Sequence, residues 1–482
     1  MSLPMELAVC LASGASCRVS LPPESSVHQL RAEAQRRLGR RGLRLAVAEA
    51  EEVTLSEAGL KDGDSIAAAA LPIQLTSTVG AFAVHAVGGR ALTWGDPQWG
   101  ADSSQVREQL AKVQQIKANQ GAFAAILDDG SVVTWGNYDY GCNSSLVREQ
   151  LVGVRQIQAT LRAFAATLDD GSAITWGYPD YGGDSSQVRE QLVRVQRIHA
   201  TQTAFAAILF DGSVVTWGNP EAGGDSSHVR EQLVRVQQIQ ATAHAFAAIL
   251  DNGSVVTWGI PGHGGDSSQV REQLVHVQQI QASRNAFAAI LEDNSVVTWG
   301  PPDCGGDSSQ VQEHLAGVCQ IQATECAFAA ILDDGSVVTW GHPDFGGDNS
   351  QVRERLKGVR QIQATQTAFA AILDDGSVVT WGNANNGGDS RQVDGLLVHV
   401  NQIQASASAF AAILDDRRVV TWGNPRAGSE SHDVHEQLVH VQQIQATGKA
   451  FAAILDNGSV VTWGDSSWGG CSSQIQTELD LL

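Results

Sequence analysis

Long apolar runs are missing from this chain of 482 residues. No stretch of about 18 apolar residues occurs, which excludes a transmembrane helix of the usual kind. The first residues, MSLPMELAVCLASG, lack the basic segment of a secretory signal peptide. We therefore expect an intracellular protein, cytoplasmic or nuclear, with no membrane partner.

Cysteine is also scarce. The seven cysteines form no Cys-x-x-Cys pair, and an odd number cannot pair completely. This pattern indicates reduced thiols in an intracellular protein and argues against a disulfide framework or a zinc site. We expect no metal and no cofactor.

Basic residues are too few to balance the acidic ones. Lys and Arg number 31 against 52 Asp and Glu, which gives a formal net charge of -21. Nucleic-acid binding depends on cationic contacts with phosphates, so a surface this acidic would repel the phosphate backbone. Nucleic acid is not an expected partner.

Catalytic motifs are absent as well. The chain has no H-E-x-x-H, no G-x-S-x-G and no Gly-rich phosphate loop. The thirteen histidines do not share one position in the repeats described below. We therefore predict a protein that is not an enzyme.

What the chain does contain is a repeat. A Trp-Gly pair preceded by Thr recurs every 41 residues without insertion, and a phenylalanine stands twelve residues before each tryptophan. Such strict self-similarity indicates a repeat architecture. We assign ten repeats to residues 72–482. Their tryptophans, which we interpret as core residues, are Trp94, Trp135, Trp176, Trp217, Trp258, Trp299, Trp340, Trp381, Trp422 and Trp463.

One repeat, residues 194–233, shows the expected elements. The segments RVQRIHA, AFAAIL and VVTW each favour a β-strand, and an Asp-Gly pair between the last two is a strong hairpin signal. The segment DSSHVREQL places Val229 four residues before Leu233, which predicts one or two turns of helix. Each repeat is therefore expected to be a three-stranded antiparallel sheet with a short helix.

Such a sheet cannot bury both faces alone, so stacked sheets are expected, as in a β-propeller or an open β-solenoid. The sequence of residues 359–388, VRQIQATQTAFAAILDDGSVVTWGNANNGG, resembles the repeat of the regulator-of-chromosome-condensation superfamily, and more closely its beta-lactamase-inhibitor branch. The resemblance implies a propeller, although that family usually has seven blades. Ten sheets could close as one ring, split into two groups or spiral openly as a superhelix.

Residues 1–71 precede the repeats and form a predicted second domain. We expect strands at residues 5–11, 18–21 and 43–47, and an amphipathic helix at residues 25–38. With the segment TLSEAGLKDGDSIAAAAL (54–71), this order resembles ubiquitin and implies an α+β β-grasp domain. The segment has no Gly-Gly ending, so we interpret it as a fixed ubiquitin-like adaptor and not as a conjugated tag.

Comparison of the ten repeats locates the variable positions. If the first strand runs upward, its turn into the second strand and the loop after Trp-Gly lie on one rim, and the Asp-Gly turn lies on the other. The first rim varies and the Asp-Gly rim does not, which is typical of a rigid frame that carries a binding surface. Drift in exposed loops is the competing interpretation. The predicted protein-binding residues on the variable rim are Trp99, Tyr140, Tyr181, His263, Phe345, Asn386, Trp468, Arg162, Arg284 and Glu325.

Paired aspartates on the constant rim could suggest a cation site. However, stacked sheets lie about 10 Å apart, whereas calcium needs oxygens at about 2.3–2.6 Å, so neighbouring turns could not share one ion. The chemistry of tight turns explains these aspartates better.

The leading functional hypothesis is a non-catalytic scaffold in a ubiquitin-linked pathway. We call residues 1–71 the head; ubiquitin-system proteins would bind there, and a client protein would bind the variable rim. Ubiquitin ligases occur in the family that the repeats resemble, so a ligase-associated adaptor role is included. The alternative, also from the resemblance, is nucleotide exchange on a small Ran-like GTPase. A third possibility is an enzyme with an unrecognised site.

Overall fold

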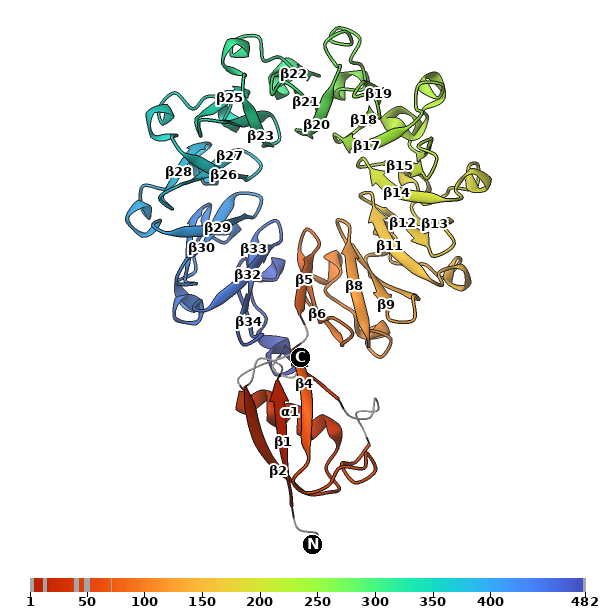
Figure 1. The fold of residues 1–482 in the computed structure, drawn as a ribbon, viewed down its shortest axis with the longest axis vertical. Helices are drawn as coiled ribbons and strands as arrows, with labels where there is room; N and C mark the ends of the chain where they lie inside the picture. The colour runs from red at the N-terminus through yellow and green to blue at the C-terminus, as the bar shows by residue number, and fades with distance from the viewer. Residues whose placement is uncertain (1–3, 12–14, 39–42, 47–52, 71, 480–482) are drawn as a thin grey trace.

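The computed structural model describes residues 4–11, 15–38, 43–46, 53–70 and 72–479. Over these residues the chain forms one four-stranded sheet and ten three-stranded sheets (Figure 1). The predicted fold class, mainly β with ten three-stranded antiparallel sheets, is confirmed. Within this part of the chain, no helix is both long and apolar enough to span a bilayer.

The four-stranded sheet has the strand order β2-β1-β4-β3 and is covered by one helix. β1 pairs antiparallel with β2 and parallel with β4. Leu30 and Ala34 of the helix are fully buried in the core under the sheet. Residues 12–14, between the first two predicted strands, lie outside the described residues, as does Val47 at the end of the third. The elements are β1 (Met5–Leu11), β2 (Ser16–Leu21), α1 (Val27–Leu38), β3 (Leu43–Leu45) and β4 (Ser65–Ala70).

Each of the ten repeats forms its own sheet, with its three strands in chain order. The first strands lie innermost around the ring and the third strands outermost (Figure 1). The first strands are β5 (Ile73–Ser77), β8 (Val113–Ala118), β11 (Val154–Ala159), β14 (Val195–Ala200), β17 (Val236–Ala241), β20 (Val277–Ala282), β23 (Val318–Ala323), β26 (Val359–Ala364), β29 (Val400–Ala405) and β32 (Val441–Ala446).

The second strands carry the AFAAIL segment and are buried along nearly their whole length. They are β6 (Ala81–Ala86), β9 (Ala122–Leu127), β12 (Ala163–Leu168), β15 (Ala204–Leu209), β18 (Ala245–Leu250), β21 (Phe287–Leu291), β24 (Ala327–Leu332), β27 (Ala368–Leu373), β30 (Ala409–Leu414) and β33 (Ala450–Leu455).

The third strands end at the Trp-Gly pair. They are β7 (Ala91–Gly95), β10 (Val132–Gly136), β13 (Ala173–Gly177), β16 (Val214–Gly218), β19 (Val255–Gly259), β22 (Val296–Trp299), β25 (Val337–Gly341), β28 (Val378–Gly382), β31 (Val419–Gly423) and β34 (Val460–Gly464).

The connecting segments differ from the prediction. The expected one or two helical turns are mostly short 3-10 helices, preceded by a turn in which an Asp side chain accepts from a backbone N–H, as Asp225 does from the Ser227 N–H at 2.8 Å. An α-helix follows only at the end, α2 (Gln476–Leu479). The 3-10 helices of this segment are Ser104–Val106, Arg148–Gln150, Arg189–Gln191, Ser227–Val229, Gln312–His314, Arg353–Arg355, Asp394–Leu396, His432–Gln437 and Ser473–Ile475.

A second short helix follows each third strand, where the sequence predicted a loop. In one repeat this helix is a π-type turn at Pro220–Gly224. The others are 3-10 helices at Pro97–Trp99, Tyr138–Tyr140, Pro179–Tyr181, Pro261–His263, Pro302–Cys304, Pro343–Phe345, Ala384–Asn386, Pro425–Ala427 and Ser466–Trp468.

The core lies between neighbouring sheets. In every repeat the phenylalanine of the second strand stacks on the tryptophan of the third, with ring centroids 5.1–5.4 Å apart. These rings contact the small alanines of the preceding sheet, as Phe246 and Trp258 do with Ala204 and Ala206. All ten tryptophans are at most 5% exposed, as expected for core residues.

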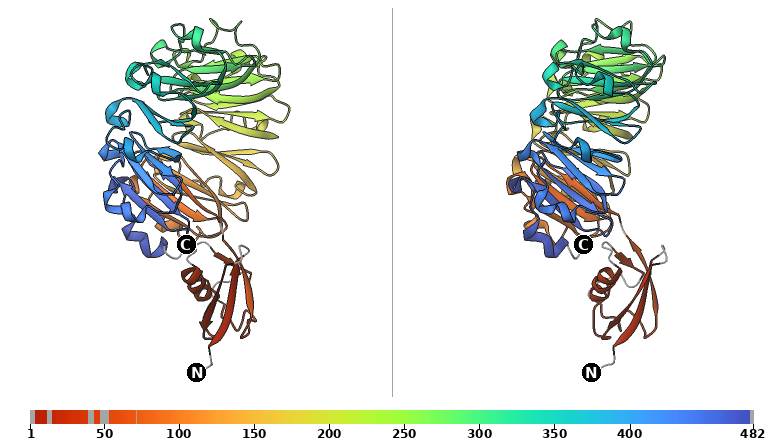
Figure 2. Two further views of the ribbon diagram at one scale, coloured as in Figure 1. Left: turned by 60° about the vertical axis from the view of Figure 1, so that its left-hand side comes forward. Right: turned by 90° about the vertical axis from the view of Figure 1, so that its left-hand side faces the viewer.

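The ten sheets close into a ring, which the sequence left open. The last sheet packs on the first through the same contacts that join other neighbours. The Trp94 indole N–H donates to the Gly469 carbonyl at 3.0 Å, and the Gly448 N–H donates to the Val79 carbonyl at 2.8 Å. No strand is exchanged between sheets, since β32, β33 and β34 form a complete sheet of their own. The three views show this ring with the head beside the C-terminal end (Figures 1 and 2).

The two rims are separated as the topology predicts. On one rim the turn between the first two strands contacts the loop after Trp-Gly, and the Thr160 hydroxyl donates to the Tyr181 carbonyl at 2.8 Å. On the other rim the Asp-Gly turn meets the start of the next sheet, where the Val154 N–H donates to the Gly130 carbonyl at 2.9 Å. The variable segments therefore share one edge of the ring.

Candidate protein-binding rim

The predicted residues after Trp-Gly occupy one repeated structural position. Each is the last residue of the short helix that follows the third strand, and a left-handed glycine follows it, as Gly182 (φ 89°) follows Tyr181. A Thr, Ser or Asn side chain of the preceding turn donates to the carbonyl of this residue in all ten repeats. The backbone under each rim side chain is therefore fixed.

Four of these residues form a continuous row of rings. Trp468 stacks on Trp99 with centroids 6.3 Å apart, and Trp99 lies 5.6 Å from Tyr140. The Arg162 guanidinium lies 5.2 Å from the ring centroids of both Tyr140 and Tyr181. These distances are within the range of aromatic and cation–π attraction. We call Trp468, Trp99, Tyr140, Arg162 and Tyr181 the aromatic row.

The aromatic row spans the last repeat and the first three, so it crosses the point where the ring closes. All five side chains are half-buried. Their inner parts cover the cores between sheets, as Trp99 and Tyr140 do. The row thus seals the edge of the core and also presents aromatic surface to solvent.

Two glycines make room for the row. A Cβ on Gly80 would lie 2.8 Å from Trp99, and a Cβ on Gly121 would lie 2.9 Å from Tyr140. The other eight repeats carry a side chain at this turn position, such as Thr203. In repeats 1 and 2, therefore, a bulky ring at the rim occurs together with a glycine at the turn position beneath it.

The remaining predicted residues do not join the row. His263 packs edge-on against His244, and Phe345 against His342, both within their own repeats. Asn386 donates to the Thr367 hydroxyl at 2.9 Å. Arg284 forms an ion pair with Glu325 at 3.4 Å between two repeats. The structure therefore divides the ten predicted residues into one contiguous group and several local contacts.

Three further residues, Lys449, Tyr178 and Leu146, were not among the predicted binding residues. The Lys449 ammonium lies 4.4 Å from the Trp468 ring centroid and extends the aromatic row. Tyr178 packs on Tyr181 and contacts Arg162. Leu146 is 95% exposed, although nine repeats carry a polar residue at its position. In the sequence, these residues are marked only by their departure from the residues at the same positions of the other repeats.

The Asp-Gly rim has a structural role. The second aspartate accepts from the backbone N–H two residues on, as Asp129 does from Ser131 at 2.9 Å. Hydrogen bonds from the Ser131 side chain and backbone lower the pKa of Asp129. Within the described ranges, no group of three or more His, Cys, Asp or Glu side chains could hold a metal ion.

Two histidines among the described residues, His85 and His199, lie on strands of different repeats. Burial lowers the pKa of both His85 and His199 to about 4. His85 lies between sheets and contacts the Gln114 carbonyl at 3.3 Å. His199 lies on β14, in a different repeat. Each is an isolated neutral imidazole at neutral pH.

Comparisons with known proteins give only structural neighbours. No family model matches the chain, and no curated protein matches it. It is similar to the structure of Prp20p from Saccharomyces cerevisiae, the yeast RCC1, with 14% identity over 65% of this chain and 83% of that chain and a TM-score of 0.33. It is also similar to human WBSCR16, with 17% identity over 57% of this chain and 77% of that chain and a TM-score of 0.32.

A further match covers 14% of this chain and 95% of Caldiarchaeum subterraneum ubiquitin, with 20% identity and a TM-score of 0.14. At these identities and TM-scores, none of the likenesses carries a conclusion about the family or the function of this chain.

Proposed function

We propose that this protein is a non-catalytic scaffold that binds a client protein through the aromatic row. The observation that carries the proposal is the continuity of Trp468, Trp99, Tyr140, Arg162 and Tyr181 across four repeats. Tyrosine, tryptophan and arginine are the residue types that most often dominate the binding energy of protein interfaces.

The row is also held in place before a partner arrives. The backbone under each ring is fixed by a side-chain hydrogen bond, and each ring rests on the core. A side chain that is already ordered loses less entropy on binding, so more of its contact energy remains as affinity. Drift alone does not explain why the rings of four repeats meet.

The head extends the proposal to a ubiquitin-linked adaptor. Its support is a small sheet with one covering helix, in which the first and last strands pair in parallel. In this arrangement the head engages ubiquitin-system proteins and the aromatic row selects the client. The test immobilises the full-length chain and adds purified ubiquitin-conjugating and deubiquitinating enzymes. Retention of none of them would remove this part of the proposal.

The aromatic row is tested by proximity labelling in cells with the full chain. The variant carries Trp99→Ala, Tyr140→Ala and Arg162→Ala, and we expect it to lose a defined set of labelled proteins. The control carries His263→Ala and Phe345→Ala, which change the same structural position outside the row. An unchanged set in the first variant, or the same loss in the control, contradicts the assignment.

Nucleotide exchange on a Ran-like GTPase is the alternative. The structure of Prp20p is described together with its binding to Gsp1p and histones, which is a property of that protein. In this chain all repeats have the same length, so no loop is extended into a wedge. Accelerated release of a labelled nucleotide from a Ran-like GTPase would favour this alternative over the scaffold.

A further inference from the structure

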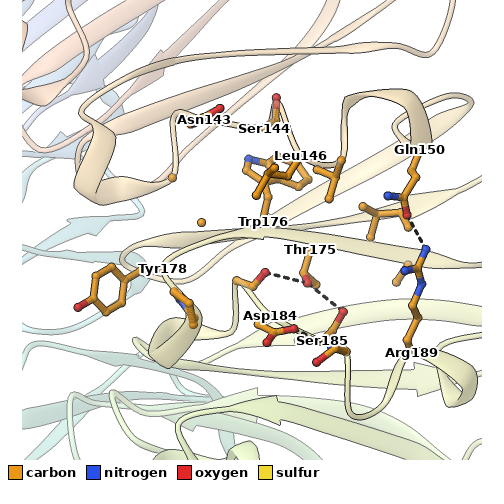
Figure 3. Close-up of a pocket in the computed structure, with 18 of the residues that line it drawn as sticks. Asn143, Ser144, Leu146, Gln150, Thr175, Trp176, Tyr178, Asp184, Ser185 and Arg189 are labelled. Carbon is orange, nitrogen blue, oxygen red and sulfur yellow. Dashed lines mark hydrogen bonds between the residues drawn. The ribbon is translucent and has the colours of Figure 1, made fainter.

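The junction between repeats 2 and 3 differs from the others. A pocket of about 560 Å³ lies there, between the loop after β10 and the strand β13 with its following loop. Figure 3 shows Leu146 beside the Trp176 indole at this pocket, with Tyr178 and Arg189 at its two sides. A pocket of this size is in the range that holds a small ligand or several side chains of a peptide.

The tryptophan at this pocket lacks the hydrogen bond that most others make. In eight repeats the indole N–H donates to a glycine carbonyl of the preceding repeat at 3.0–3.1 Å. Trp176 and Trp135, at this junction and the preceding one, are each 4% exposed, and the N–H of neither has a partner among the described residues. A buried N–H without an acceptor is costly, so an acceptor from a bound partner would be favourable here.

A second regular bond is missing at the same junction. Along the variable rim, the turn between the first and second strands is bonded to the same turn of the next repeat. The backbone N–H of its middle residue donates to the carbonyl of the equivalent residue, as the Leu161 N–H does to the Gln202 carbonyl at 2.9 Å. Nine junctions have this bond within the described residues, and the one from Gln120 to Leu161 does not. The opposite rim keeps its bond from Val154 to Gly130. Repeats 2 and 3 therefore keep the backbone bond at the Asp-Gly rim and lack the one at the variable rim, where Arg162 contacts Tyr140.

The residues that line the opening depart from the other repeats. Ala173 stands where eight repeats have valine, but its side chain is 3% exposed and packs with Leu192 and Val215 in the core between repeats 3 and 4. Ile174 is half-buried, whereas Val215 at the same position of the next repeat is buried. Leu146 (95% exposed) and Tyr138 (73% exposed) add apolar surface at the mouth. Exposed apolar residues gathered at an opening are typical of a binding surface.

Charge indicates the chemistry of the occupant. Asp139 and Asp184 line the pocket, and Asp180 joins Asp184 in an adjoining hollow of about 280 Å³. The one cation in the pocket lining, Arg189, donates to Gln150 at 2.6 Å. The exposed carboxylates favour Lys or Arg on the partner, since opposite charges across an interface steer association and select partners.

We propose that this junction pocket binds a short segment of a partner protein in which apolar side chains alternate with lysine or arginine. An apolar side chain enters between Leu146 and Trp176, a backbone carbonyl accepts from the Trp176 N–H, and the basic side chains face the three aspartates. This inference rests on the proposed scaffold function, because it names the chemistry that one part of the variable rim recognises.

The test uses labelled peptides with the full-length chain. The probes contain leucine or phenylalanine flanked by lysines, the same peptides with glutamate flanks, and lysine-flanked peptides with serine in place of the apolar residue. We expect only the first group to bind. Binding should fall at least about ten-fold for Leu146→Gln and for Ile174→Ala, which remove apolar surface from the mouth and from the wall of the pocket.

Each variant has a matched control elsewhere in the ring. Leu396→Gln replaces another exposed leucine, and Val256→Ala truncates the residue at the same strand position of repeat 5. Both controls should bind as the parent does. A thermal melt of every variant shows whether it folds, and the indole N–H signal of Trp176, identified with Trp176→Phe, should shift on binding.

Three results would overturn the inference: no peptide binding at millimolar concentration, equal binding of glutamate-flanked or serine peptides, or unchanged affinity in both pocket variants. The variant of the aromatic row distinguishes failure of this inference from failure of the proposed function. If that variant still loses its partners while peptides fail to bind, the pocket assignment is wrong and the scaffold remains.

Discussion

Trp94 in the first ring sheet donates its indole N–H to the carbonyl of Gly469 in the last, at 3.0 Å and across 375 positions of sequence. The same bond joins seven other pairs of neighbouring sheets. The ring is therefore closed by an ordinary junction. This closure brings the rim residues of repeats 10 and 1 together and makes the aromatic row continuous.

Closure predicts that Leu479, in the segment after the last sheet, is as important as the equivalent leucine inside the ring. Leu479 is 1% exposed and packs against Leu75 and Phe82 of the first ring sheet, as Leu233 packs against Phe246. We expect Leu479→Ala and Leu233→Ala to lower the free energy of unfolding by similar amounts, about 2–4 kcal/mol, measured by urea denaturation. If Leu479→Ala is neutral, the ring is open in solution.

The unpartnered indole predicts an asymmetry between two tryptophans. Trp217→Phe removes a buried hydrogen bond to Gly182 in addition to ring volume, whereas Trp176→Phe removes ring volume alone. We expect Trp217→Phe to cost about 1 kcal/mol more in the free energy of unfolding. Equal denaturation midpoints for the two variants would show that Trp176 finds an acceptor in the free protein.

Buried His85 predicts a dependence of stability on pH. It is fully buried, and burial lowers its pKa from 6.5 to about 4, against the opposing effect of the Gln114 carbonyl. The unfolded chain takes up this proton below pH 6.5 and the folded chain only near pH 4. The free energy of unfolding therefore falls between these values, by up to about 3 kcal/mol.

His85→Ile places at this position the residue found at Ile126 in the next repeat. We expect the variant to lose less stability than the parent between pH 7 and pH 4.5, measured as the melting temperature. Parallel curves for the two proteins would mean that His85 is not desolvated.

The aspartates of the constant rim predict acid sensitivity at lower pH. Hydrogen bonds from Ser172 lower the pKa of Asp170 below 3.8, so the stability it confers is present above that value and is lost as the pH falls through the folded pKa. Asn252 makes the same turn contact without titrating. Replacing Asp129, Asp170, Asp334 and Asp375 by Asn should flatten the fall in melting temperature between pH 5 and pH 3. An unchanged fall would remove the turns as its cause.

The glycines under the aromatic row give a test that leaves its rings in the chain. Gly121→Val should displace Tyr140, since even a Cβ would lie 2.9 Å from its ring. We expect a weaker near-ultraviolet circular dichroism signal and client binding reduced about ten-fold. Thr203→Val, at the same turn position of repeat 4, should change neither. A full signal in Gly121→Val would show that the ring adapts to the added side chain.

The sequence alone determined the repeat, its three strands, the buried Phe and Trp of each sheet and the separation of the rims. These features follow from local patterns: the Asp-Gly hairpin signal, the continuous apolar run of the second strand and the constant spacing of 41 residues. It overstated the helix in the segment that leads to the next repeat, where Ser227–Val229 form only a 3-10 turn.

Tertiary structure alone decided closure and the grouping of the rim. Whether ten sheets meet depends on the small rotation between each pair of neighbours, and that rotation is set by packing that no single repeat contains. Trp468 and Trp99 stand 369 residues apart in the chain, and only closure brings their rings to 6.3 Å. The opening beside Trp176 likewise arises from two repeats packed together, because its walls come from the loop after β10 in repeat 2 and from β13 in repeat 3.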